Sequence, residues 1–211
     1  MNVKVFPFNP LQENTFLIWD ETNEAAVIDA GMLFEREKEQ LKRFIEENKL
    51  KLKRVLNTHL HLDHQFGNKF LFDTYGVMPE AGADDEFLLD TVHLSAKNWG
   101  LPYLEPAQRL GSYLVDNQKI AFGNTTLTAL HTPGHSPGSH SLYNKEAGVV
   151  FVGDVLFNGS IGRTDFVRGD YATLISSIEG KLLTLPDDTV VYSGHGPETT
   201  IGAEREFNPF L

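Results

Sequence analysis

Strand-like and helical segments follow one another in the same order in both halves of the chain. In the first half, an amphipathic helix over 33–48 comes before the last of four predicted strands, at 3–8, 14–19, 25–31 and 53–59. In the second half, a helix over about 171–183 comes before the last of five, at 112–115, 125–131, 140–144, 148–154 and 189–195. Because a sheet buries its apolar face against another layer, this order predicts an α/β fold with two packed sheets and helices outside them.

The segment 73–110 does not fit this order. Glycine and proline interrupt it repeatedly, and it carries several acidic residues between 84 and 90. We expect a partly helical excursion that shapes the pocket as a lid and contributes little to the stability of the fold.

The composition limits the class of protein. With 211 residues, 41% of them hydrophobic, the chain can bury a substantial core, so we expect one domain over 1–211. No apolar run approaches the roughly 20 residues of a membrane-spanning helix, and the first ten residues lack the pattern of a secretory signal. We therefore expect a cytoplasmic protein with no membrane partner. A net charge of −11 offers no broad basic surface, so nucleic acid is not an expected partner.

The chain contains no cysteine. This excludes disulfides, thiolate nucleophiles and sulfur-ligated metals, so any metal site must use nitrogen and oxygen ligands.

The stretch THLHLDHQFGN, residues 58–68, places three histidines and an aspartate within six positions. In extended chain, residues two apart point the same way, so His59 and His61 can share one ion. Asp63 and His64 then begin a helix, where neighbouring side chains diverge by about 100°. One motif can therefore provide ligands to two neighbouring ions.

Three further candidate ligands follow predicted strands. His135 lies between two Pro-Gly breaks, Asp154 ends the apolar run FVGD, and His195 follows VVYSG. Taken singly, Asp154 could cap a turn or helix and His195 could be a hydrogen-bonded histidine at the sheet rim. Together, three polar residues at the carboxyl ends of buried strands favour a metal site held by rigid backbone.

The motifs THLHLDH, TPGHSPGS, GDVLF and SGHG, in this order, resemble those of the metallo-β-lactamase superfamily. GSIGRTDF and NPLQENTFLI are most similar to the short glyoxalase II-like hydrolases. The resemblance implies a four-layer αββα sandwich with a dinuclear site. It assigns His59, His61 and His135 to one metal and Asp63, His64 and His195 to the other, with Asp154 bridging them. Asp29, in AAVIDAG, would be a buried structural acid near the site.

The implied activity is that of a metal-dependent hydrolase, a glyoxalase II-like thioesterase acting on a small acyl thioester or ester. The ligand set suits two zinc ions first, with iron or manganese as alternatives. The nucleophile would be a hydroxide that bridges the metals, which Asp63 could also orient.

Other readings stay open. An iron-dependent persulfide dioxygenase and a lactonase or other ester hydrolase share the fold. Arg163 is a candidate substrate contact, although a structural pair with Asp165 explains it equally well. His93 and His140 are expected to be structural, and so is His131, for which a role in orienting a metal ligand is the alternative. Full-length glyoxalase II enzymes carry an added helical domain that contacts glutathione, so we expect weak glutathione recognition here. Nothing in the sequence predicts an oligomeric state.

Overall fold

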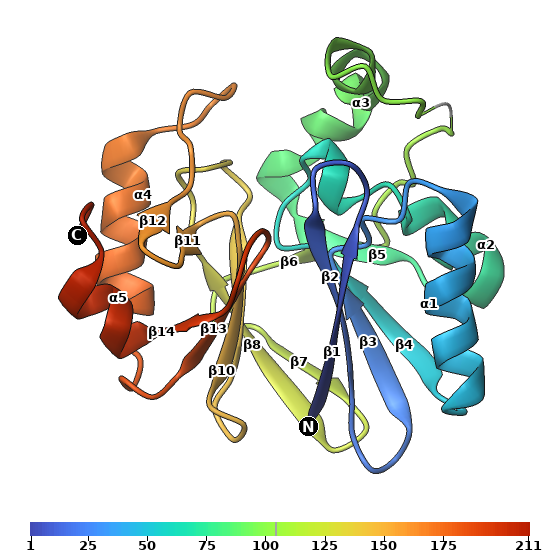
Figure 1. Ribbon diagram of the computed structural model, residues 1–211, viewed down its shortest axis with the longest axis horizontal. Helices are drawn as coiled ribbons and strands as arrows, with labels where there is room; N and C mark the ends of the chain where they lie inside the picture. Colours follow the sequence, from blue (N-terminus) through green and yellow to red (C-terminus); the bar gives the residue numbers. More distant parts are fainter. Residues whose placement is uncertain (104) are drawn as a thin grey trace.

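A computed structural model describes residues 1–103 and 105–211. Leu104, within the predicted excursion 73–110, lies outside the described residues. Two six-stranded sheets face each other, and helices cover the outer face of each, so the layers run helix, sheet, sheet, helix (Figure 1). The predicted four-layer αββα sandwich is confirmed.

The first sheet has the order β1-β2-β3-β4-β5-β6. Its strands are β1 (Asn2–Phe8), β2 (Glu13–Trp19), β3 (Glu24–Ile28), β4 (Lys51–Leu56), β5 (Pro79–Gly82) and β6 (Ser112–Leu114). β1, β2 and β3 pair antiparallel, whereas β3, β4, β5 and β6 run parallel.

The second sheet has the order β14-β13-β10-β9-β8-β7. Its strands are β7 (Lys119–Phe122), β8 (Thr125–His131), β9 (His140–Asn144), β10 (Val149–Gly153), β13 (Val190–Ser193) and β14 (Thr199–Thr200). A two-stranded sheet of β11 (Leu156–Phe157) and β12 (Ser160–Ile161) lies beyond β10. β10 and β13 run parallel, so their carboxyl ends lie together.

The helices are α1 (Glu35–Glu47), α2 (Asn68–Tyr75), α3 (Phe87–Asn98), α4 (Tyr171–Ser177) and α5 (Ile201–Phe207). Single turns η1 (Leu62–His64) and η2 (Ala83–Asp85) precede α2 and α3, and a π-helical turn, η3 (Ile178–Leu182), continues α4. Within the described residues, no helix has both the length and the apolar character that crossing a membrane requires.

Alternating side chains explain the layers. On β2, Phe16 and Ile18 point into the core between the sheets, where Phe16 packs on Phe151 of β10 with ring centroids 5.0 Å apart. Leu17 points the other way, into the core beneath α1. On β10, Val150 likewise faces the core beneath α4 and α5. Both sheets are therefore apolar on both faces, which requires a helix layer on each.

The structure agrees with both predicted helices and corrects the view of the excursion. The helix predicted at 33–48 is α1, and the one at 171–183 is α4 with its π-helical turn. The segment 73–110 is partly helical, as α3 shows, but it also contains β5, a buried interior strand paired with β4 and β6. The expectation that it contributes little to the fold is therefore wrong for β5.

Candidate metal centre

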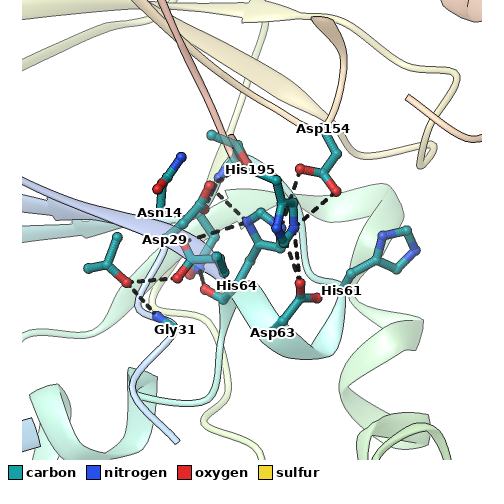
Figure 2. Close-up of polar contacts among 12 residues, drawn as sticks. Asn14, Asp29, Gly31, His61, Asp63, His64, Asp154 and His195 are labelled. Atoms are coloured by element: carbon teal, nitrogen blue, oxygen red, sulfur yellow. Dashed lines mark hydrogen bonds and ion pairs between the residues drawn. The ribbon is translucent and has the colours of Figure 1, made fainter. Parts of the chain in front are cut away.

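The candidate ligands lie at one edge of the sandwich, where strands of both sheets end. His59 and His61 follow β4, and Asp63 and His64 lie in η1. His135 belongs to the loop between β8 and β9, Asp154 directly follows β10, and His195 comes two residues after β13. Figure 2 shows Asp63, His64, Asp154 and His195 converging at this edge.

The side chains form two clusters. In the first, ligand atoms of His59, His61 and His135 all lie within 4.8 Å of one another. In the second, the same is true of Asp63, His64 and His195. These are the two groups that the family resemblance implies.

Asp154 lies between the clusters. Its Oδ1 is 3.5 Å from His64 Nε2, and its Oδ2 is 3.7 Å from His135 Nε2 and 3.6 Å from His195 Nε2. One carboxylate therefore reaches both clusters, as a bridging ligand must.

Asp29 holds a histidine of each cluster from behind. Its Oδ2 is 3.1 Å from His64 Nδ1 and accepts a 2.7 Å hydrogen bond from the Thr58 hydroxyl, whose oxygen is 3.1 Å from His59 Nδ1. Thr58 N also donates to Asp29 Oδ1 at 2.7 Å. These contacts fix the two rings through the nitrogens that face away from the site. Asp29 is thus the buried structural acid that the resemblance implies.

Backbone carbonyls orient two more histidines. His135 Nδ1 lies 2.8 Å from the carbonyl oxygen of Arg163, and His195 Nδ1 lies 3.1 Å from that of Leu11. Donation from Nδ1 leaves the lone pair of Nε2 directed at the site, which is the tautomer that metal binding needs.

Among the candidate ligands, three buried polar atoms have no hydrogen-bond partner within the described residues: His59 Nε2, His64 Nε2 and Asp154 Oδ1. An unsatisfied buried polar atom costs roughly 1–3 kcal/mol. Two imidazole nitrogens and a carboxylate oxygen that converge without a partner are what a bound cation would satisfy, and nitrogen with oxygen suits zinc, iron or manganese. The residues fit a divalent metal.

The pKa values in the two clusters shift in opposite directions. In the second cluster, burial opposes protonation of His64 and His195, but the nearby carboxylates outweigh it and raise the pKa of both rings, so a bound metal ion would displace a proton there. In the first cluster, two rings are already in the form that coordinates. Burial, together with the neighbouring histidines, lowers the pKa of His59 well below its ordinary value and that of His61 to about 3. Both rings are therefore neutral at pH 7 and can coordinate. Burial opposes ionisation of Asp154, but the charges of His64, His135 and His195 outweigh it and lower its pKa.

Two polar residues of β2 support the site and were not predicted. Asn14 Nδ2 donates to the carbonyl oxygens of Ser193 and Gly196, at 3.0 and 2.9 Å, and so holds the loop that carries His195. Glu13 is fully buried, with Oε1 4.0 Å from His64 Nδ1, and burial raises its pKa well above its ordinary value. Both lie in the motif NPLQENTFLI, where polar residues at the start of a buried strand were the available signal.

Arg163 lies next to the first cluster, because its carbonyl oxygen contacts His135, but its charge is already paired. Its guanidinium makes two hydrogen bonds to Asp165, at 2.9 and 2.8 Å, and lies over the ring of Phe166, 4.7 Å from its centroid. The structural pairing considered from the sequence is present. The same Phe166 ring lies 4.7 Å from the ring of His61 and therefore lies beside the first cluster.

The other three histidines lie outside the clusters. His131 and His140 pack on each other and contact the backbone carbonyls of Pro137 and Gly138, respectively. His93 stacks on Tyr103.

Comparisons with known proteins agree with this geometry. The family model described as the metallo-beta-lactamase superfamily matches residues 8–195. Hydroxyacylglutathione hydrolase GloC from Haemophilus influenzae is 42% identical, and the alignment covers 100% of this chain and 98% of GloC.

Two solved structures have nearly the same backbone. BLEG-1 B3 metallo-beta-lactamase has a TM-score of 0.89 at 35% identity, covering 100% of this chain and 99% of BLEG-1. TTHA1623, solved in a di-iron-bound form, has a TM-score of 0.88 at 35% identity, covering 99% of this chain and 100% of TTHA1623. The chain therefore belongs to the metallo-beta-lactamase superfamily of metal-dependent hydrolases.

Proposed function

We propose that the chain is a dinuclear metal-dependent thioesterase of the glyoxalase II-like type. The observation that carries this proposal is the position of Asp154, a single carboxylate within 3.7 Å of nitrogen atoms from both histidine clusters. The residues of the two clusters, with Asp154 between them, would hold two divalent ions: His59, His61 and His135 the first, and Asp63, His64 and His195 the second.

Bound there, the ions would lower the pKa of a shared water towards neutrality and polarise the carbonyl of the substrate. The absence of cysteine excludes a thiolate nucleophile, and with this water the proposed reaction needs no side-chain nucleophile. Zinc is the first choice for this ligand set, and the di-iron form of TTHA1623 supports testing iron equally.

Asp63 is the proposed catalytic residue. Burial opposes its ionisation, but His64 and His195 outweigh it and lower its pKa, so the carboxylate is charged at neutral pH. Both of its short contacts, 3.2 Å to His195 and 3.7 Å to His64, use Oδ2. Oδ1 can therefore accept a hydrogen bond from the attacking water and orient it.

The substrate would enter past Phe166, whose ring lies beside His61 and His135 at 4.7 and 5.6 Å. An apolar face suits the acyl chain or carbon skeleton of a thioester. Arg163 could bind a substrate carboxylate only by exchanging its partner Asp165, so its proposed contribution is small.

A thioester is favoured over other acyl substrates because GloC bears the name hydroxyacylglutathione hydrolase and is matched over 98% of its length. That match also argues against our expectation of weak glutathione recognition. The Michaelis constant for S-lactoylglutathione tests the point, because a low micromolar value would overturn the expectation.

Three other activities share the geometry. A lactonase or other ester hydrolase would use the same water, and an iron-dependent persulfide dioxygenase would use the same ligands with oxygen. The name of BLEG-1 adds a β-lactam as a fourth substrate to test.

The test is to measure bound metal on the purified protein and to assay thioesters, lactones, β-lactams and persulfides in parallel. We expect two ions per chain, thiol release from thioesters, and loss of hydrolysis after chelation with recovery on adding metal back. Full activity with one ion or none would contradict the dinuclear proposal. Oxygen uptake with a persulfide, without thioester cleavage, would assign the chain to the dioxygenases.

The cytoplasmic location, the single domain over 1–211 and the absence of a nucleic-acid partner remain predictions from the sequence.

A further inference from the structure

Asp85 is a buried carboxylate that belongs to neither cluster. It is the last residue of η2, the turn that directly follows β5, and it is 0% exposed to solvent. It accepts three hydrogen bonds: from Leu60 N at 3.2 Å, from the Ser136 hydroxyl at 2.7 Å and from Gly138 N at 2.7 Å. All three donors come from segments distant from it in the sequence.

The donors belong to the two loops that make the first cluster. Leu60 stands between His59 and His61, and Ser136 directly follows His135. One carboxylate thus bonds to both sides of the cluster at once. Oδ2 takes the Leu60 and Ser136 bonds and Oδ1 takes that of Gly138, so both oxygens are needed.

The Asp85 turn and the 136–138 loop are tightly packed against each other. A methyl group on Gly138 would lie 2.7 Å from both Cγ and the backbone N of Asp85. A methyl group on Gly82 would lie 2.8 Å from the carbonyl carbon of Gly138 and closer still to its oxygen. The Asp85 turn and the 136–138 loop are therefore in direct contact, and movement of one moves the other.

An asparagine could replace this carboxylate only in part. The backbone N–H groups of Leu60 and Gly138 can only donate and an amide has one acceptor oxygen, although its NH₂ group could donate to the Ser136 hydroxyl. Burial raises the pKa of Asp85, although the bonds from Ser136, Gly138 and Leu60 lower it in part. The fold therefore keeps an acid where burial disfavours its charged form.

We propose that Asp85 is a positioning residue that sets the distance between the His59–His61 loop and His135 and thereby the metal affinity of the first cluster. This inference rests on the proposed dinuclear function. The inference gives the 73–110 segment a role that the sequence did not indicate. Through Asp85, which is not itself a ligand, the segment holds the two loops that carry the ligands of the first cluster.

The test is an Asp85→Asn variant, which keeps the shape of the side chain. Metal-free protein is titrated with Zn²⁺ in competition with a chromophoric chelator. We expect one of the two dissociation constants to rise by about 10–100-fold, the usual effect of removing a residue that holds a metal ligand in place. The other should stay within about threefold of wild type. His135→Ala, which removes a ligand of the first cluster, identifies the affected site.

Asp20→Asn is the matched control. Asp20 is also a buried acid, 3% exposed, and its carboxylate accepts bonds from Thr22, Asn124 and Thr125. It ties the β2–β3 turn to the β7–β8 turn, at the end of the sandwich opposite the metal centre (Figure 1). Its loss should lower the thermal midpoint and leave both Zn²⁺ constants unchanged.

Each outcome decides something. Two unchanged constants in Asp85→Asn would overturn the positioning role and leave the dinuclear proposal intact. Wild-type protein that binds fewer than two ions would overturn the dinuclear proposal instead. If Asp85→Asn does not fold, Ser136→Ala removes one of the three bonds. It should weaken the same constant by a smaller factor, and an unchanged constant there would equally overturn the role.

Discussion

Gly194 offers a sharp test of the geometry of the metal centre. It lies next to His195, and its backbone is held from both sides, by donation to Gly153 O at 2.8 Å and by acceptance from Asn14 N at 2.7 Å. It does not adopt a positive φ, so alanine suits its backbone. An added methyl group would meet Asp154 Oδ1 and would lie 2.6 Å from His64 Cε1.

The expected effect of Gly194→Ala follows from these distances. Ordinary van der Waals contact begins at 3.4 Å, so the His64 ring or the Asp154 carboxylate must move by nearly 1 Å. A misplacement of about 1 Å can reduce catalysis by roughly 100-fold, equivalent to about 2.7 kcal/mol of transition-state stabilisation. Since Asp154 reaches both clusters, we expect weaker binding of both ions.

The assay follows thiol release from a thioester with a chromogenic reagent, alongside metal analysis of the same sample. Gly180→Ala is the control, because a methyl group there meets nothing within 4 Å. It should keep wild-type activity and gain about 0.5–1 kcal/mol of stability, since alanine favours a helix over glycine. If Gly194→Ala keeps two tightly bound ions and wild-type kcat/KM, the arrangement of Asp154 and His64 described above is wrong.

Three further predictions test other parts of the molecule. Asp154→Ala should lose both ions, whereas His135→Ala should lose one, as metal analysis after dialysis will show. Chelation should lower the thermal midpoint, because saturating metal at about 1,000 times its dissociation constant stabilises the fold by roughly 4 kcal/mol. Burial opposes ionisation of Asp20, but hydrogen bonds from Thr22, Thr125 and Asn124 lower its pKa. Its stabilising effect is therefore present above the unfolded pKa of about 3.9 and lost as the pH falls through the lower folded value. In urea unfolding, the free energy of unfolding should fall less between pH 5 and pH 3 for Asp20→Asn than for the wild-type protein.

Much of the architecture could be predicted because its causes are local. The alternation of Phe16, Leu17 and Ile18 directs side chains to opposite faces of β2, and the same rule identified most long strands. The residues from His59 to His64 are close in sequence, so their convergence needs only the end of β4 and a short turn. His135, Asp154 and His195 were recognisable because each follows a strand or a glycine-rich break.

The unpredicted parts depend on contacts between distant residues. β5 reads Pro-Glu-Ala-Gly, with no β-branched residue, and forms a strand because β4 and β6 lie on either side of it. Asp85 and Asp84 are adjacent acids, yet the first is buried and the second exposed. Their burial differs because Asp85 bonds to the loop at Ser136, some fifty residues further along the chain. No local sequence pattern reveals that contact.

The distribution of the candidate ligands has a consequence for the order of events during synthesis. Four of them lie between His59 and His64, and the other three come from the second sheet. A ribosome adds roughly 5–20 residues per second, so His195 follows His64 after an interval on the order of ten seconds. The first cluster has all its residues once His135 has been made, and the second only once His195 has been made. If the proposed dinuclear site is correct, both ions can bind tightly only after the residues of both sheets have been synthesised and have folded against each other.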